Sequence, residues 1–188
     1  MADGTLKVGT ITTSSGSGTI TLGQSGETVD MANGTITLNS GMKMTPAFAA
    51  YMADASQSPS TDTNTKINMT TEDYDTDGAY DAANAKFTIP AGAAGKYRFV
   101  MGVRAGNTHT ARMVAKIYKN GSTQFVQAEN RWAIGSGTTF VSVNLAADIV
   151  CEVGDYFEPY VYMSYNAGLK GSSTERHTFW SASKLIGV

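Results

Sequence analysis

The most specific chemical motif in the sequence is a run of three aspartates at alternate positions, Asp73, Asp75 and Asp77, followed by Gly78. This spacing matches the first half of a calcium-binding loop, in which carboxylates supply hard oxygen ligands and glycine permits a sharp turn. The second half does not match, because Asn84 stands where the bidentate glutamate is needed. The motif predicts a calcium site, with a solvated acidic loop or a contact between subunits as the alternatives.

Arg131 and Trp132 form a second candidate group, since they adjoin each other and follow Asn130. A tryptophan ring can stack on a sugar or anchor a protein partner, and a neighbouring arginine can add charge and hydrogen bonds. Tyr74, within the aspartate motif, is a third candidate. We therefore expect glycan or partner contacts at Arg131, Trp132 and Tyr74. The alternative is that Trp132 packs beneath a loop or against a neighbour.

Motifs of covalent or phosphate chemistry are absent from the sequence. It contains no Gly-x-Ser-x-Gly elbow and no glycine-rich phosphate loop with a lysine. Cys151 is the single cysteine, so no intrachain disulfide forms, and its neighbours favour a small buried side chain over a nucleophile. The sequence predicts a protein that is not an enzyme and that has no cofactor apart from a possible Ca²⁺.

Charge and hydropathy exclude two classes of partner. The 188 residues include 14 Lys+Arg and 16 Asp+Glu, a net charge of −2, which is not the basic footprint of a nucleic-acid-binding protein. No apolar run approaches the ~20 residues of a membrane helix. The first residues lack the basic and apolar regions of a secretory signal, so we expect assembly in a cytoplasm.

Residues 1–45 differ from the rest of the chain, since no aromatic residue precedes Phe48. A Gly-Thr-Ile-Thr phrase recurs between Ser- and Gly-rich turns, which predicts short strands with a thin apolar stripe. Such strands cannot hold a sheet by themselves, so we expect an attachment or oligomerisation segment; a flexible linker is the alternative. The stripe consists of Ile11, Ile20, Leu22, Ile36 and Leu38.

Residues 46–188 are predicted to form a separate all-β domain, an antiparallel sandwich or jelly roll. In the run 157–165, Phe157 and Val161 fall on one face, while Tyr160 and Tyr162 fall on the other. An aromatic second face indicates a contact with another copy of the chain. The strand-like runs are 87–89, 97–103, 113–118, 140–145, 157–165 and 179–186.

The aromatic part of the chain resembles the trimeric globular head of the complement first component, a relative of the tumour necrosis factor fold. Later segments, 119–121, 153–156 and 178–182, resemble that family's hairpin turn, Gly-Asp turn and closing strand. Ala85 and Ala182 depart from the pattern, where the family often has glycine, and the loop 90–95 is longer. The matching signature positions are Gly78, Tyr80, Phe87, Pro90, Gly95, Tyr97 and Phe99.

This resemblance implies a ten-stranded jelly roll packed as a homotrimer, with aromatic residues along the three-fold axis. No nucleic acid or membrane is expected as a partner. The residues expected at the trimer interface are Tyr97, Phe99, Tyr160, Tyr162 and Phe179.

The N-terminal phrases resemble the start of phage fibre and structural proteins, which implies a bacteriophage virion protein. The apolar stripe would then dock onto tail or capsid proteins, and the head would be a short fibre or knob that contacts host surface glycans through its loops. A capsid decoration protein that stabilises the shell is the alternative. A bacterial binding module outside any virus is a third possibility.

Overall fold

The computed structural model describes residues 44–107, 110–133, 139–165 and 167–185. The chain divides into two compact units, Met1–Thr37 and Leu38–Val188, and every described residue belongs to the second. The predicted docking stripe, from Ile11 to Leu38, lies outside the described residues and stays a prediction. Within the described part, no helix is long and apolar enough to cross a membrane.

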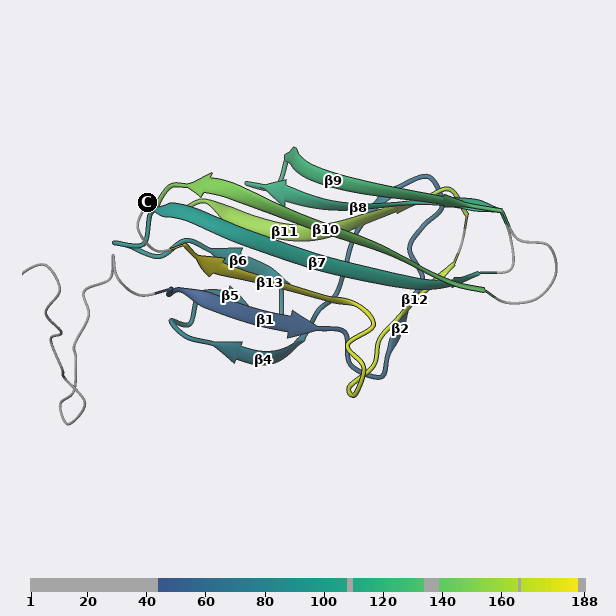
Figure 1. Ribbon diagram of the computed structural model, residues 1–188, viewed down its shortest axis with the longest axis horizontal. Helices are drawn as coiled ribbons and strands as arrows, with labels where there is room; N and C mark the ends of the chain where they lie inside the picture. Colours follow the sequence, from purple (N-terminus) through teal and green to yellow (C-terminus); the bar gives the residue numbers. More distant parts are fainter. Residues whose placement is uncertain (1–43, 108–109, 134–138, 166, 186–188) are drawn as a thin grey trace, which may run out of the picture. The chain divides into compact units, whose positions relative to one another are not determined.

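Regular structure in the described residues consists of β-strands, which form two antiparallel sheets (Figure 1). The strands are β1 (Ala47–Tyr51), β2 (Ser56–Gln57), β3 (Asn64–Lys66), β4 (Thr71–Asp75), β5 (Tyr80–Asp81), β6 (Lys86–Thr88), β7 (Gly95–Asn107), β8 (Ala111–Lys119), β9 (Thr123–Trp132), β10 (Thr139–Cys151), β11 (Tyr156–Met163), β12 (Gly168–Lys170) and β13 (Phe179–Lys184). The prediction of an all-β, antiparallel sandwich is confirmed.

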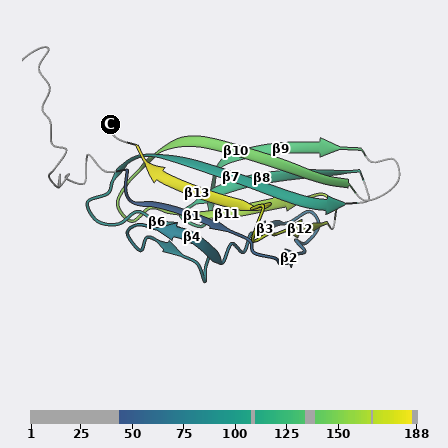
Figure 2. The ribbon, with the colours of Figure 1, turned by 60° about the horizontal axis from the view of Figure 1, so that its bottom comes forward.

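The first sheet is organised around β7. β10 pairs with β7 along its whole length on one edge, and β13 and β12 pair with it on the other. β1 and β4 continue the sheet beyond β13, so the order β10, β7, β13, β1, β4 can be followed in Figure 2. The short β2 extends the sheet beyond β12.

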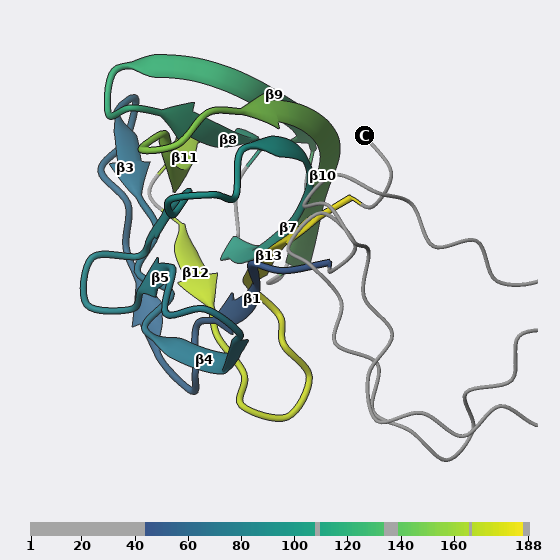
Figure 3. The ribbon, with the colours of Figure 1, turned by 90° about the vertical axis from the view of Figure 1, so that its left-hand side faces the viewer.

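The second sheet has the order β5, β6, β11, β8, β9, and β3 pairs with β11. Figure 3 shows this sheet facing the first, with β8 and β11 opposite β7 and β13. Ten strands therefore make two five-stranded layers, and the short β2, β3 and β12 lie beside them. This arrangement brings the start of β8 next to the ends of β9 and β11.

Aromatic rings fill the space between the sheets. Phe48 stacks on Tyr80 with ring centroids 4.5 Å apart and meets Trp180 edge-on at 4.8 Å, while Phe99 contacts Phe157 at 4.7 Å. The Trp180 Nε1–H donates to the Tyr80 hydroxyl at 3.2 Å, so the buried indole is satisfied inside the core. Large aromatic rings contribute most of the burial in such a small core.

Two predicted trimer-interface residues belong to this core. Tyr97 and Phe99 are both 0% exposed, and the Tyr97 hydroxyl donates to the Ala93 carbonyl at 2.6 Å. The alternation of β7 turns both side chains inward, between the two sheets of the same subunit. The prediction that Tyr97 and Phe99 form the interface between subunits is therefore wrong.

Strand β9 and strand β4 were not among the predicted strands. β9 has a polar sequence with weak alternation and pairs with β8, while β4 contains part of the aspartate motif and pairs with β1. The predicted acidic loop is therefore partly strand. In both cases the partner strand supplies the hydrogen bonds that local side-chain pattern alone does not indicate.

Candidate ligand-binding site

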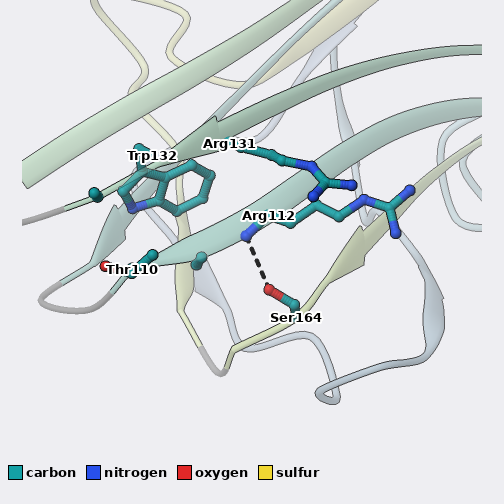
Figure 4. A pocket seen from close by; sticks show the side chains of 7 residues that line it. Thr110, Arg112, Arg131, Trp132 and Ser164 are labelled. Carbon is teal, nitrogen blue, oxygen red and sulfur yellow. Dashed lines mark hydrogen bonds between the residues drawn. The ribbon is translucent and has the colours of Figure 1, made fainter.

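An open pocket of about 430 Å³ lies where β8 begins and β9 ends. Figure 4 shows Trp132 at one side of it and the side chains of Arg112 and Arg131 together at the other. The prediction that Arg131 and Trp132 belong to a binding site therefore coincides with a real concavity. Its lining is Thr110, Ala111, Arg112, Arg131, Trp132, Ala133 and Ser164.

Antiparallel register brings these residues together. Ala111 pairs with Trp132, and Arg112 pairs with Arg131. Because Ala111 is buried toward the core, alternation places Arg112 and Arg131 on the outer face of the sheet. Ser164 is fixed beside them, since the Arg112 N–H donates to its Oγ at 2.8 Å and its own N–H donates to the Arg112 carbonyl at 3.0 Å.

Glu129 holds the two guanidinium groups near each other. Its carboxylate lies 2.7 Å from an Arg112 nitrogen and 2.5 Å from Arg131 Nε. Hydrogen bonds from Arg112 and Arg131 lower the pKa of Glu129, so this carboxylate stays ionised. This cluster of two cations and one anion has a net positive charge.

Two buried polar atoms at this pocket have no hydrogen-bond partner: Arg112 Nε and Trp132 Nε1. Both are donors, and both belong to pocket-lining residues. Buried donors are nearly always paired in folded proteins, by protein groups or by solvent, because leaving one unpaired costs free energy. Two donors beside this pocket are therefore left without a partner among the described residues.

Sequence reasoning missed Arg112 and Ser164. They come from the start of β8 and from just after β11, and neither has a distinctive neighbour in the sequence.

Trp132 itself is half-buried and packs against the core, as the alternative interpretation of this residue expected. Tyr74 is 49% exposed but lies on β4, in the other sheet, so it does not share the site.

The three aspartates of the predicted calcium site each have a different partner. Asp73 pairs with Arg176 at 2.7 Å, and Asp75 accepts the Tyr80 N–H at 2.8 Å. Asp77 accepts the Thr76 hydroxyl at 2.7 Å. Across the part of the chain that the structure describes, no three acidic, His or Cys side chains gather in a metal-holding group. Calcium binding stays a prediction that this arrangement does not favour.

Cys151 is buried in the core, and burial raises the pKa of its thiol to about 12. A thiol with so high a pKa is a poor nucleophile near neutral pH, because the thiolate is the reactive form. The structure thus agrees with the interpretation of Cys151 as a small buried side chain.

The other three predicted interface residues lie on the outer faces of the two sheets. Tyr160 and Tyr162 are on the second sheet, where Tyr160 stacks on Tyr118 at 4.3 Å and Tyr162 donates to Asp62 at 2.6 Å. Phe179 is on the first sheet, half-buried. The predicted alternation of β11 is confirmed, because its tyrosines point away from the buried face.

The outer face of the first sheet carries few charges at its centre. One row of paired residues reads Tyr74, Ala49, Ser181, Val100 and Ala146 from β4 to β10. We call this row, with the adjacent row of Phe179, Gly102 and Asn144, the uncharged rows. Outer faces of antiparallel sheets are usually polar, so this surface suits a protein contact.

The chain matches no known family model and no curated protein. Among solved structures it is similar to the globular domain of the zebrafish complement 1qA protein, with a TM-score of 0.53 and 12% identity over 76% of this chain and 98% of that chain. It is also similar to the Eiger TNF from S. frugiperda, with a TM-score of 0.52 and 12% identity over 76% of this chain and 95% of that chain. These likenesses confirm the jelly-roll fold that the signature residues predicted.

Proposed function

We propose that this protein is a non-enzymatic, self-assembling head that binds a saccharide through the pocket at Trp132. The observation that carries the proposal is an open pocket lined by Trp132 and two arginines, beside which the buried donors Trp132 Nε1 and Arg112 Nε have no partner. Sugars offer apolar ring faces and many acceptor oxygens, which suit these groups. Neither matched structure is named as an enzyme, which agrees with a binding role.

Self-assembly is supported by the two outer faces. A three-fold assembly uses a heterologous interface, in which one patch of a subunit meets a different patch of its neighbour. The uncharged rows around Phe179 supply one such patch, and the tyrosines Tyr160 and Tyr162 supply an aromatic surface on the other sheet. We propose a homotrimer on this basis.

A place on a phage particle is the further part of the proposal, and its support comes from the N-terminal phrases. In this role, residues 1–45 dock on tail or capsid proteins and the head projects as a short fibre or knob toward host glycans. Immunogold labelling of purified particles tests it, with label expected on the tail or on projecting fibres. Label spread evenly over the shell would instead identify the capsid decoration protein, and no label would remove the virion role.

The binding role is tested by staining host cells with the fluorescent full-length protein. We expect Trp132→Ala to lower staining at least about tenfold, because the ring and its N–H donor are both lost. The matched control is Phe125→Ala, which removes an aromatic ring that is 48% exposed at the opposite end of β9. Circular dichroism confirms that both variants fold. Undiminished staining by a folded Trp132→Ala variant would contradict the role of the pocket.

A further inference from the structure

We propose that the ligand of the Trp132 pocket is an anionic saccharide, whose carboxylate or sulfate group binds the guanidinium groups of Arg112 and Arg131 while Trp132 contacts the rest of the sugar. This inference rests on the proposed saccharide binding and adds the chemical class of the sugar. It follows from the polarity of the unsatisfied groups and from the charge around them.

The unsatisfied groups are all of one kind. Arg112 Nε and Trp132 Nε1 are the buried side-chain atoms without partners among the described residues, and each can only donate. Ser164 Oγ already accepts the Arg112 N–H at 2.8 Å, so its hydroxyl hydrogen is available as a further donor. A neutral sugar hydroxyl both donates and accepts, whereas a carboxylate or sulfate only accepts, and this match favours the anion.

The charge at the site also favours an anion. The Arg131 side chain is 71% exposed, and it forms an ion pair with Glu129, which it shares with Arg112. An acidic ligand group can replace Glu129 as the partner of Arg131 without burying a new unpaired charge. Arginine suits this task because its fork of N–H groups matches a planar carboxylate.

Glu129 gives the inference a distinctive consequence. Its carboxylate competes with an acidic ligand for both guanidinium groups, so its removal should strengthen the binding of acids. The Glu129→Gln substitution keeps the shape and one acceptor oxygen but removes the negative charge. The gain should be larger for an acidic sugar than for a neutral one, because only the acid competes with the Glu129 carboxylate for the guanidinium groups.

The experiment uses probes that differ in a single group: methyl β-D-glucuronide, methyl β-D-glucoside 6-sulfate and the neutral methyl β-D-glucoside. Binding to the full-length protein is measured by titration calorimetry or by ligand-observed NMR. We expect one or both acids to bind at least about tenfold more tightly than the neutral sugar, and the glucuronide and sulfate arms separate the two anions. The difference should shrink as salt is raised.

Variants assign the effect to the pocket. Trp132→Phe keeps an aromatic ring but removes the N–H, and Arg131→Gln removes a charge; each should weaken binding of the acid about fivefold or more. Glu129→Gln should tighten it. Arg98→Gln is the control, since Arg98 is an exposed arginine on β7 paired with Asp148, outside the pocket.

The outcomes separate this inference from the proposed function. Equal binding of acidic and neutral sugars, lost in Trp132→Phe, overturns the anion inference and leaves saccharide binding standing. A loss in Arg98→Gln as large as in Arg131→Gln overturns it as well, because the attraction would then be a diffuse charge effect. Host-cell staining without binding of any probe also overturns the inference, and absence of both staining and probe binding removes the proposed function itself.

Discussion

At the scale of single residues, burial decides how much an ion pair contributes. Asp155 is 9% exposed at the turn before β11, where it accepts hydrogen bonds from Asn120 at 3.0 Å and from the Glu152 N–H at 2.8 Å, and pairs with Lys119 at 2.6 Å. Burial alone raises the pKa of the Asp155 carboxyl, but these partners outweigh it, so the pKa lies below its ordinary value. The Asp148–Arg98 pair is exposed and screened by water.

This contrast predicts a pH-dependent effect of Asp155→Asn. A lowered pKa in the folded state stabilises the protein above the unfolded pKa of about 3.9, and that stabilisation is lost as the pH falls through the folded value. We therefore expect Asp155→Asn to cost about 1–3 kcal/mol in the free energy of unfolding at pH 7, and much less near pH 3.

Urea unfolding at the two pH values measures the effect, and Asp148→Asn is the matched control with a much smaller cost expected at pH 7. A cost for Asp155→Asn that stays constant from pH 7 to pH 3 would contradict the role of its charge.

At the scale of elements, β7 has two distinct faces. Its inward side chains build the core, and its outward side carries Val100 and Gly102 in the uncharged rows. Gly102 is the position where the ring of Phe179 crosses the strand: a Cβ there would lie 2.4 Å from the ring and 2.9 Å from Asn144 Oδ1. Glycine is needed here for the close approach of the ring and not for its backbone conformation.

Gly102→Ala is expected to push the Phe179 ring off the sheet while leaving the core intact. Overpacking of this kind costs about 1–3 kcal/mol, so the melting temperature should fall, and the oligomer should dissociate at a higher protein concentration. The control is Gly168→Ala on β12, where the nearest atom to a Cβ is Lys170 Nζ at 3.9 Å. Equal melting temperatures and masses for the two variants would show that the Phe179 contact stabilises neither the fold nor the oligomer.

At the scale of the whole molecule, the question is the number of subunits. We predict that light scattering of the full-length protein gives three times the mass of one chain, because the uncharged rows and the tyrosine face supply the two patches of a three-fold interface. A shortened protein that begins near Pro46 should also be a trimer, because both patches lie in the head. A monomeric mass for the full-length protein would contradict the homotrimer and the interpretation of both faces.

Much of the fold could be predicted from the residues. The alternation of Phe157, Val161 and Met163 against Tyr160 and Tyr162 indicated one buried and one outward face of β11, and the structure confirms it. The signature aromatics indicated the right jelly roll, but Tyr97 and Phe99 were assigned to the wrong surface. Pattern alone shows that a side chain is buried, not whether its own subunit or a neighbour buries it.

The candidate site was predicted only in part, because Arg131 and Trp132 are neighbours in the chain and the rest of the pocket is not. Arg112 and Ser164 reach it only through the pairing of β8 with β9 and with β11. The aspartate motif shows the converse: its spacing favours a metal loop, but pairing of β4 with β1 gives the carboxylates separate partners.

By itself the sequence determined what short-range physics controls: strand periodicity, the turn positions, and the contrast in composition between residues 1–45 and the aromatic domain. Tertiary structure alone decided which strand edges pair, which rings face inward, and which donors are left without partners at Trp132 and Arg112. The physical reason is that periodicity is a property of one strand. Burial and hydrogen-bond satisfaction depend on neighbours that lie far apart in the chain.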